Sequence, residues 1–196
     1  MPRPDRSRAA LVASAARLFR RQGYAATGVN QILETAEVKA GSLYHHFPGG
    51  KQELAAAVVD SVGTDIERRL RELLNSGLPV SDIVDTWIDQ MASGLDSDRR
   101  DGCPIEPIAT ESVNASPAVR DASARAFGGW CFAVADRLRA DGWAASDADQ
   151  TALAVIALVE GALILSRLSG DAAALHAVKA AVRTLISPAS GAHGAN

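Results

Sequence analysis

The sequence predicts an all-α fold with about nine helices, and three observations support this class. Helix-forming residues recur at spacings of three and four along almost the whole chain, and alanine is abundant. Strand-forming residues never alternate with polar residues over a useful length, which disfavours a sheet. Hydrophobic residues make up 47% of the 196 positions, which is enough for a substantial core.

The first two helices are short and lie close together in the chain. A cap at Asp5 or Ser7 and a stop at Gly23 bound the first, whose apolar stripe is Leu11, Val12, Ala15, Leu18 and Phe19. Thr27 is expected to cap the second. Its inward positions follow the helical spacing i, i+3, i+4 and i+7 at Val29, Ile32, Leu33 and Ala36.

The segment AEVKAGSLYHHF (36–47) predicts a third helix after a tight turn at Glu37-Val38. A helix this short is marginal alone in water, so something must anchor it. Leu43 and Phe47 share one side and supply the anchor, with Ala40 near them. Three short helices with this turn match a helix-turn-helix. The outward positions are Gly41, Ser42, Tyr44 and His45, with His46 on the flank and Lys39 at the helix start.

The remaining helices are longer. One is expected over 51–74, with Gly63 as a soft point, and the next contains the stripe Val84, Trp87, Ile88 and Met91. A short piece follows within 102–112. Ser116-Pro117 then opens a long helix, Ser146 or Asp147 begins an apolar one, and Asp171 caps the last, which ends near Ile186. We therefore expect domains at 1–53 and 54–188, and a disordered tail at 189–196.

Charge and composition narrow the function. The chain has net charge −3, yet residues 1–53 contain eight basic and four acidic side chains, so only this end is expected to meet a polyanion. The run at 151–165 is shorter than a membrane span and contains Glu160. We expect no membrane association, a cytoplasmic location, and two reduced thiols at Cys103 and Cys131.

Residues 23–54 resemble the DNA-binding signature of TetR-type transcriptional regulators. The matching positions are Gly23, Tyr24, Thr27, Ile32, Ala36, Val38, Gly41, Leu43, Tyr44, His46, Phe47 and Lys51. The segments GCPIEPIATES (102–112) and EGALILSR (160–167) are similar to motifs of the LmrA/YxaF-like subgroup. Two positions depart from the family pattern: Glu37 stands where Gly is usual, and Ala40 stands where Lys is often found.

The resemblance implies roles for nine residues at an operator of double-stranded DNA. Thr27, Tyr44, His46 and Lys51 would hold phosphates, while Lys39, Ala40, Gly41, Ser42 and His45 would face base edges. The chemistry suits these roles. A lysine ammonium attracts phosphate, small residues let the backbone approach a thymine methyl group, and a serine hydroxyl both donates and accepts.

The last two helices, about 147–186, are expected to form a homodimer. The first is apolar around most of its circumference, and the second contains the small residues Ala172, Ala173, Ala177, Ala180 and Ala181. Small residues allow helices to approach closely, and the family uses this pair in a four-helix bundle. Packing within one subunit is the alternative interpretation.

A small-molecule effector is the second expected partner. The large or polarisable apolar residues of the second domain could line its pocket: Trp87, Met91, Cys103, Ile105, Phe127, Trp130, Cys131 and Leu163. An ordinary packed core explains the same spacing. Glu160 could pair with Arg167, meet a ligand polar group or lie at a wet edge of the dimer.

The leading hypothesis is a ligand-responsive repressor that an apolar or aromatic effector releases from a palindromic operator. The first alternative is a thiol-based redox sensor that uses Cys103, because Arg99 and Arg100 lie nearby in the sequence. The second is an enzyme. We expect no catalysis, cofactor or metal, because no catalytic or nucleotide-binding motif occurs, and the adjacent His45 and His46 point to different sides of a helix.

Overall fold

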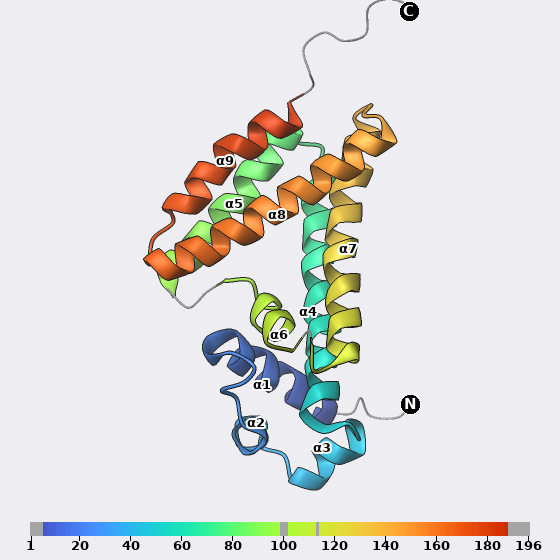
Figure 1. Cartoon of the computed structure of the whole chain (residues 1–196), viewed down its shortest axis with the longest axis vertical. Helices are drawn as coiled ribbons and strands as arrows, with labels where there is room; N and C mark the ends of the chain where they lie inside the picture. The colour runs from blue at the N-terminus through green and yellow to red at the C-terminus, as the bar shows by residue number, and fades with distance from the viewer. Residues whose placement is uncertain (1–5, 99–101, 113, 188–196) are drawn as a thin grey trace, which may run out of the picture. The chain divides into compact units, whose positions relative to one another are not determined.

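The computed structural model describes residues 6–98, 102–112 and 114–187, and within them the chain contains nine helices and no strand (Figure 1). The predicted all-α class is confirmed. In chain order the helices are α1 (Arg6–Gln22), α2 (Val29–Ala36), α3 (Ala40–His46), α4 (Gly50–Leu74), α5 (Val80–Ser97), α6 (Glu106–Ser112), α7 (Pro117–Ala140), α8 (Ala145–Ser169) and α9 (Ala173–Ile186).

The chain divides into two compact units, which we describe separately. Residues 1–70 and 100–130 form the first unit, and residues 71–99 and 131–196 form the second. Helices α4 and α7 therefore supply residues to both units. The boundaries expected from the sequence, 1–53 and 54–188, stay a prediction about function, and the tail at 189–196 lies outside the described residues.

In the first unit, α1 packs against α2 and α3, and α2 packs against α3. The contacts are made by side chains that are at least nine-tenths buried: Leu11, Ala15, Phe19, Ile32, Leu33, Leu43 and Phe47. Leu43 and Phe47 are 0% and 1% exposed, so the predicted anchoring of the seven-residue α3 is confirmed. Burial in the tertiary structure stabilises a helix that would not form alone.

Two helix starts differ from the predicted ones. The N-cap of α2 is Gly28, and the Thr27 hydroxyl instead donates to the carbonyl oxygen of Gly23 at 2.7 Å. Ser7 lies inside α1, and Asp5 lies outside the described residues. The stop at Gly23 is confirmed, since this residue has φ +87° and its N–H donates to the Phe19 carbonyl.

The turn of the helix-turn-helix contains a left-handed glutamate. Glu37 has φ 55° and ψ 38° and follows the last residue of α2. Its N–H donates to the carbonyl of Glu34, and the N–H of Val38 donates to that of Leu33, so both bonds close the end of the helix. An L-residue with a Cβ is disfavoured in this conformation, whereas glycine adopts it freely.

Replacing Glu37 with Gly is expected to stabilise the protein by about 1 kcal/mol, because it removes the cost of the left-handed conformation. Urea unfolding followed by circular dichroism measures the change. Glu34→Gly is the matched control, since Glu34 is an exposed position inside α2. There glycine should destabilise by about 1 kcal/mol. Equal effects of the two substitutions would contradict the explanation.

Close contact between α4 and α7 in the first unit depends on Gly63. A Cβ at this position would lie 2.6 Å from the Cβ of Ala126. The carbonyl oxygen of Gly63 also accepts a hydrogen bond from the indole N–H of Trp130 at 3.0 Å. The prediction that Gly63 is a soft point is wrong, because α4 is continuous through this residue and the missing side chain serves packing.

Gly63→Ala is expected to destabilise the protein by about 1–3 kcal/mol, because the added methyl group overpacks a site bounded by backbone-fixed atoms. The comparison is Gly128→Ala in α7, where a Cβ would meet nothing within 4 Å. That substitution should stabilise by about 0.5–1 kcal/mol, as expected for an exposed helix interior. Thermal unfolding of both variants tests the pair, and a neutral Gly63→Ala would contradict the close-contact interpretation.

In the second unit, α9 packs against both α8 and α5. Ion pairs join α9 to α5: Lys179 lies 2.8 Å from Asp89, and Arg183 lies 3.0 Å from Asp85. The helix α8 begins at Ala145 with Ala144 as N-cap, so it starts slightly before the predicted first residue, Ser146 or Asp147. At the last helix the N-cap is Ala172, and the predicted cap Asp171 lies one residue earlier, where its carboxylate accepts the N–H of Ala173 at 2.9 Å.

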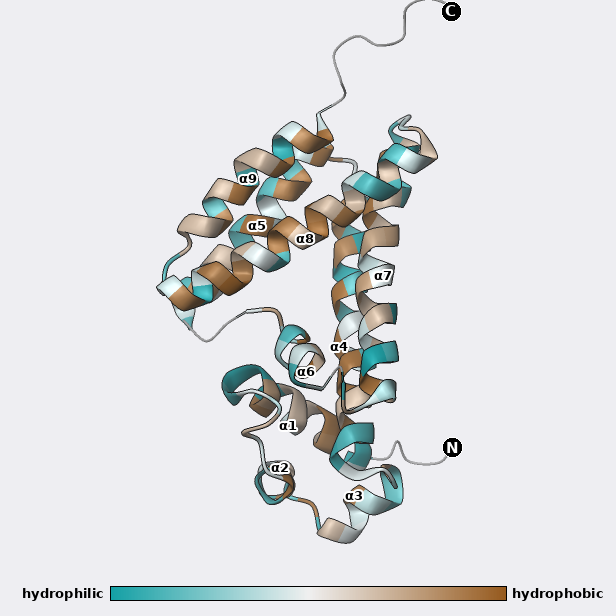
Figure 2. Cartoon of the chain, in the orientation of Figure 1, coloured by the Kyte–Doolittle hydropathy of each residue, from teal (hydrophilic) through white to brown (hydrophobic). Residues whose placement is uncertain are grey.

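Helix α8 is apolar along much of its length (Figure 2). Among the described residues it is the single helix that is long and apolar enough to cross a membrane by length and composition alone. That criterion is weak evidence, because core helices of water-soluble proteins also meet it. Here α8 packs against α9 and α5.

Candidate nucleic-acid interface

The outward face of α3 is the centre of the candidate site. Leu43 and Phe47 point into the core, so the remaining positions face outward. Five of the residues predicted to contact DNA are exposed, and two are half-buried: the exposed ones are Lys39, Ala40, Gly41, Tyr44 and His45, and the half-buried ones are Ser42 and His46. The structure thus places these seven residues on one short segment, while their individual roles stay predictions.

The start of α3 can be approached closely. A Cβ added at Gly41 would meet nothing within 4 Å, so the space beside the backbone is open. Tyr44 is 57% exposed, and the rings of His45 and His46 meet edge to face with centroids 4.8 Å apart. Open backbone flanked by hydroxyl and imidazole groups suits recognition of base edges and phosphates in a major groove.

Lys51 lies in the first turn of α4, next to the turn between α1 and α2. Its Nζ is 4.1 Å from the ring centre of Tyr24, in a cation–π arrangement. Burial lowers the pKa of Lys51, and the negative charge of Glu111 acts in the opposite direction. Burial raises the pKa of Tyr24. The ammonium group is half-buried against the aromatic ring, within the segment predicted to hold phosphate.

Thr27 is the most buried of the predicted DNA-binding residues, with 1% of its surface exposed. Besides its bond to Gly23, its hydroxyl accepts a hydrogen bond from the amide of Gln22 at 3.2 Å. The same amide donates to the side chain of Gln31 on α2 at 2.7 Å. In this structure Thr27 organises the turn, and contact with a phosphate stays a prediction.

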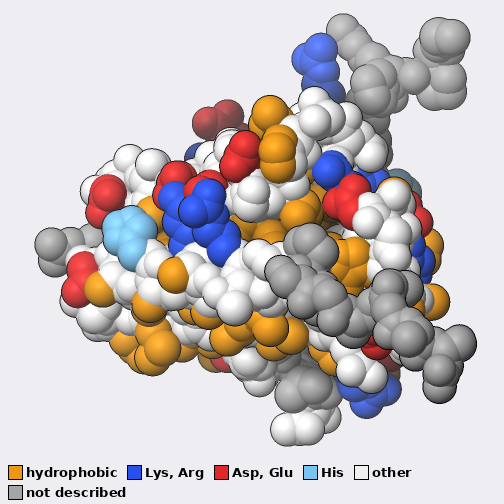
Figure 3. Space-filling model, turned by 90° about the horizontal axis from the view of Figure 1, so that it is seen from above, with side chains coloured by type: hydrophobic (Ala, Val, Ile, Leu, Met, Phe, Trp, Pro, Cys, Tyr) orange, Lys and Arg blue, Asp and Glu red, His pale blue; other side chains and the backbone are white. Residues whose placement is uncertain are grey.

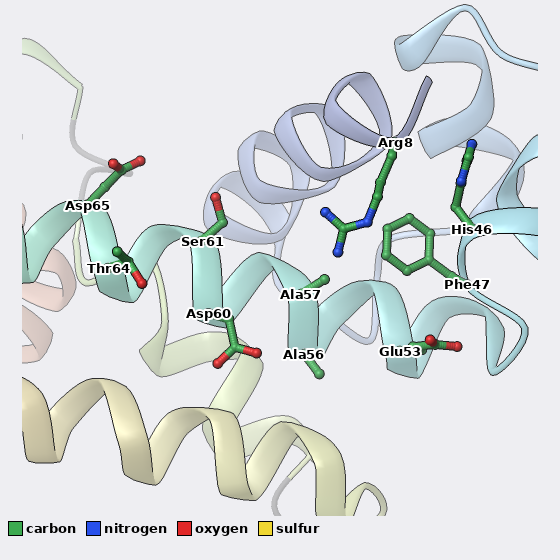
Figure 4. Close-up of a pocket in the computed structure, with 10 residues that line it drawn as sticks. All are labelled: Arg8, His46, Phe47, Glu53, Ala56, Ala57, Asp60, Ser61, Thr64 and Asp65. Carbon is green, nitrogen blue, oxygen red and sulfur yellow. The ribbon is translucent and has the colours of Figure 1, made fainter. Parts of the chain in front are cut away.

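Two features of the first unit are absent from the sequence-based predictions. One is the contact of Glu111 with the turn between α1 and α2, which joins residues 86 positions apart. No periodicity or motif relates such distant positions. The other is a groove of about 560 Å³ (Figure 4), lined by Arg8, His46, Phe47, Glu53, Ala56, Ala57, Asp60, Ser61, Thr64 and Asp65.

The groove in Figure 4 has a mixed lining, in which Phe47, Ala56 and Ala57 are apolar and the other residues are polar or charged. The guanidinium of Arg8 lies over the Phe47 ring at 5.3 Å from its centre. Asp60 forms an ion pair with Arg125 of α7 at 2.8 Å. The groove therefore differs from the predicted effector pocket in every residue.

The eight predicted effector-binding residues are divided equally between the two units. The first unit contains Cys103, Ile105, Phe127 and Trp130, and the second contains Trp87, Met91, Cys131 and Leu163. Within the first unit, the rings of Phe127 and Trp130 meet edge to face at 4.8 Å. The effector-binding role of all eight residues stays a prediction.

The two cysteines differ from reactive thiols in their surroundings. Cys103 is 6% exposed, and burial raises the pKa of Cys131. A sensing thiol is usually exposed and has a lowered pKa. Arg99 and Arg100, which motivated the redox hypothesis for Cys103, lie outside the described residues.

Helices α8 and α9 expose an apolar surface, which we call the α8–α9 face. Its larger members are Leu153, Ile164, Leu165, Leu168 and Leu185, and its small members are Ala173, Ala177, Ala180 and Ala181. Leu165 and Leu168 are 59% and 79% exposed. Figure 3 shows hydrophobic side chains gathered along one side of the surface seen there. Ala172, also predicted for a dimer contact, is buried within the subunit.

Helices α1, α2 and α3 pack together and leave the outward face of α3 open, and the other described elements of the chain are also helices. This arrangement defines a DNA-binding protein of the helix-turn-helix class. Comparison with known families agrees. Residues 11–58 match the family model described as bacterial regulatory proteins, tetR family. Residues 79–181 match the C-terminal domain of LmrA/YxaF-like transcriptional regulators. The chain belongs to the TetR family of transcriptional regulators, within its LmrA/YxaF-like group.

Individual relatives extend this similarity. The chain is 32% identical to the transcriptional regulator YxaF of Bacillus subtilis over 84% of its own length and 87% of that protein. It is 36% identical to the transcriptional repressor NemR of Escherichia coli over 67 residues, which are 34% of this chain and 33% of NemR. A TetR regulator of Legionella pneumophila has the same fold, with 23% identity, a TM-score of 0.80, and coverage of 91% of this chain and 96% of that one.

Regulators of this family bind operator DNA and are typically dimers that respond to small molecules. The similar proteins found by sequence are transcriptional regulators. DNA binding and transcriptional regulation therefore describe this chain.

Proposed function

We propose that this protein is a dimeric repressor that binds a near-palindromic operator and is released from it by a small apolar or aromatic effector. The observation that supports it most directly is the exposed, open face of α3, held on the core by Leu43 and Phe47. A cytoplasmic location is part of the proposal, since the protein must reach the chromosome.

The proposed division of roles at the operator follows the chemistry of each side chain. Lys51, Tyr44, His46 and Thr27 contact phosphates, which fixes the position of the domain on the duplex but supplies no sequence information. Lys39, Ser42 and His45 face base edges, and Ala40 and Gly41 keep the backbone close to the groove floor. Replacing a residue that contacts phosphate should weaken binding to all DNA sequences alike. Replacing a residue that contacts a base should instead reduce the preference for the operator sequence.

The proposed dimer forms through the α8–α9 face. Exposed leucines together with four exposed alanines form a surface that two antiparallel helix pairs can bury at close distance. Contiguous exposed apolar surface of this kind marks interaction sites. Two recognition helices spaced by about 34–36 Å, one turn of DNA, would then bind adjacent half-sites.

The proposed effector is apolar or aromatic because the candidate residues are large, soft and aromatic. Trp87 and Met91 of the second unit are half-buried, as are Phe127 and Cys131. Half-buried aromatic and sulfur-containing side chains retain accessible surface that a flat hydrophobic molecule can cover. Effector binding would change the spacing of the two recognition helices through the long α4.

A gel-shift titration with the DNA upstream of the protein's own gene tests the proposal. We expect a specific complex at nanomolar protein and physiological salt, which excess unrelated DNA does not displace. A thermal-shift screen of aromatic and cationic lipophilic compounds should yield ligands that also dissociate this complex. Absence of any specific retardation across a range of salt concentrations would count against the proposal.

A further inference from the structure

A carboxylate outside the helix-turn-helix segment reaches into it. Glu111 lies on α6, and its Oε2 accepts a hydrogen bond from the N–H of Ala25 at 2.5 Å. Ala25 belongs to the turn between α1 and α2. Helices α1 and α6 are in contact, and both belong to the first unit. The hydrogen bond therefore joins the DNA-binding helices to a helix that follows them by about 60 residues in the sequence.

The backbone of the turn is shaped to accept this carboxylate. Gly23 has φ +87°, and a Cβ at that position would lie 2.7 Å from Oε1 of Glu111. Any other residue would meet backbone strain there, and its Cβ would displace the flexible end of the Glu111 side chain. Gly23 and Ala25 thus approach the two oxygens of one carboxylate from the same turn.

The same carboxylate acts on Lys51. The residue between Gly23 and Ala25 is Tyr24, whose ring centre lies 4.1 Å from the ammonium of Lys51. Burial disfavours the charged form of the lysine and lowers its pKa, while Glu111 opposes that effect by its negative charge. One side chain therefore meets the turn by a hydrogen bond and the ammonium by its charge.

We propose that Glu111 is a positioning residue for DNA binding. Its bond to Ala25 fixes the turn that leads into α2 and, with it, the neighbouring Tyr24, whose ring contacts the ammonium of Lys51. It touches no DNA itself. The proposal rests on the phosphate-binding role proposed above for Lys51, so its test must separate failure of the two ideas.

The alternative is that Glu111 opposes DNA binding, because its negative charge lies near an ammonium expected to meet phosphate. The two ideas differ in the sign of the effect. If Glu111 positions the turn, its removal weakens DNA binding. If it repels phosphate, removal tightens binding and does so most at low salt. The exposed position of Glu111 makes substitution compatible with folding.

The test measures the affinity of full-length variants for the upstream fragment retarded by the natural protein, over a range of salt concentrations. We expect Glu111→Ala to weaken binding about 10-fold, as for loss of a hydrogen bond to a charged acceptor. The slope of log affinity against log salt should stay unchanged, because no phosphate contact is lost. Glu111→Gln retains an acceptor for the Ala25 N–H and should recover affinity to within about threefold of the natural protein.

Two further variants make the result decisive. Glu106→Ala removes a carboxylate from the same helix whose described contact is with Thr110 at 3.1 Å, and it should leave affinity unchanged. Lys51→Ala should lower the slope of log affinity against log salt concentration by about 1 for each subunit. Tighter binding by Glu111→Gln, or unchanged binding by Glu111→Ala, would overturn the positioning role. An unchanged slope in Lys51→Ala would instead overturn the role proposed for Lys51.

Discussion

Gly41→Glu is expected to reduce operator affinity at least about 100-fold and to leave the folded structure intact. The position is exposed and a Cβ there meets nothing within 4 Å, so the fold has room for the new side chain. A carboxylate in the first turn of a helix is also favourable for the helix itself. At the DNA surface, however, it fills the space needed for close approach and places negative charge against phosphates, which costs several kcal/mol across an interface.

Fluorescence anisotropy with labelled operator measures the loss, and circular dichroism with thermal unfolding verifies the fold. Gly128→Glu is the matched control, because Gly128 is also an exposed helical glycine with open space and the change in net charge is the same. The control should bind operator within about twofold, since one distant exposed charge is largely screened. Equal loss in the two variants would assign the effect to net charge and contradict a DNA-contacting role for Gly41.

Leu165→Glu should convert the protein to a monomer and abolish specific operator binding. Leu165 is 59% exposed in the single subunit and lies on the α8–α9 face, so a carboxylate there is tolerated in the monomer but is buried unpaired in the proposed bundle. A lone helix-turn-helix contacts a single half-site, so affinity should fall at least about 100-fold at physiological salt.

Sedimentation or light scattering at micromolar concentration measures the mass of the particle, and anisotropy measures its affinity for operator. Leu78→Glu provides the comparison, because Leu78 is also an exposed leucine, at 44%, but lies between α4 and α5. That variant should stay dimeric and bind DNA. A dimeric Leu165→Glu protein would place the subunit contact elsewhere and remove the basis of the proposed four-helix bundle.

Hydrophobic spacing predicted most of the fold because each helix repeats its pattern several times. The inward face of α3 follows from Leu43 and Phe47 alone, and Ser116-Pro117 does begin α7, with the Ser116 hydroxyl accepting the N–H of Val119 at 3.4 Å. The N-caps of α2 and α8, Gly28 and Ala144, were not predicted. A polar residue near a helix start is a common cap, yet Thr27 forms its bond within the preceding turn instead.

Contacts between distant residues could not be predicted. Glu111 looks like any exposed carboxylate on a short helix, and only the folded chain brings it to Ala25. Gly63 suggested flexibility because a glycine weakens a helix. In the folded chain Ala126 lies so close to it that only a residue without a Cβ fits there. Prediction of the effector site meets a different obstacle. Large apolar residues at helical spacing are expected in a packed core as well as in a binding pocket.

The separation of the two faces of α3 has a consequence for how regulators of this kind diversify. Leu43 and Phe47 hold the helix from behind, Gly41 and His45 are exposed on the opposite side, and Ala40 is exposed at the helix start. Under the proposed base-reading role, exchanging those outer residues would change which sequence is recognised at little cost in stability. A duplicated gene could therefore acquire a new set of targets through a few substitutions, while its scaffold is inherited unchanged.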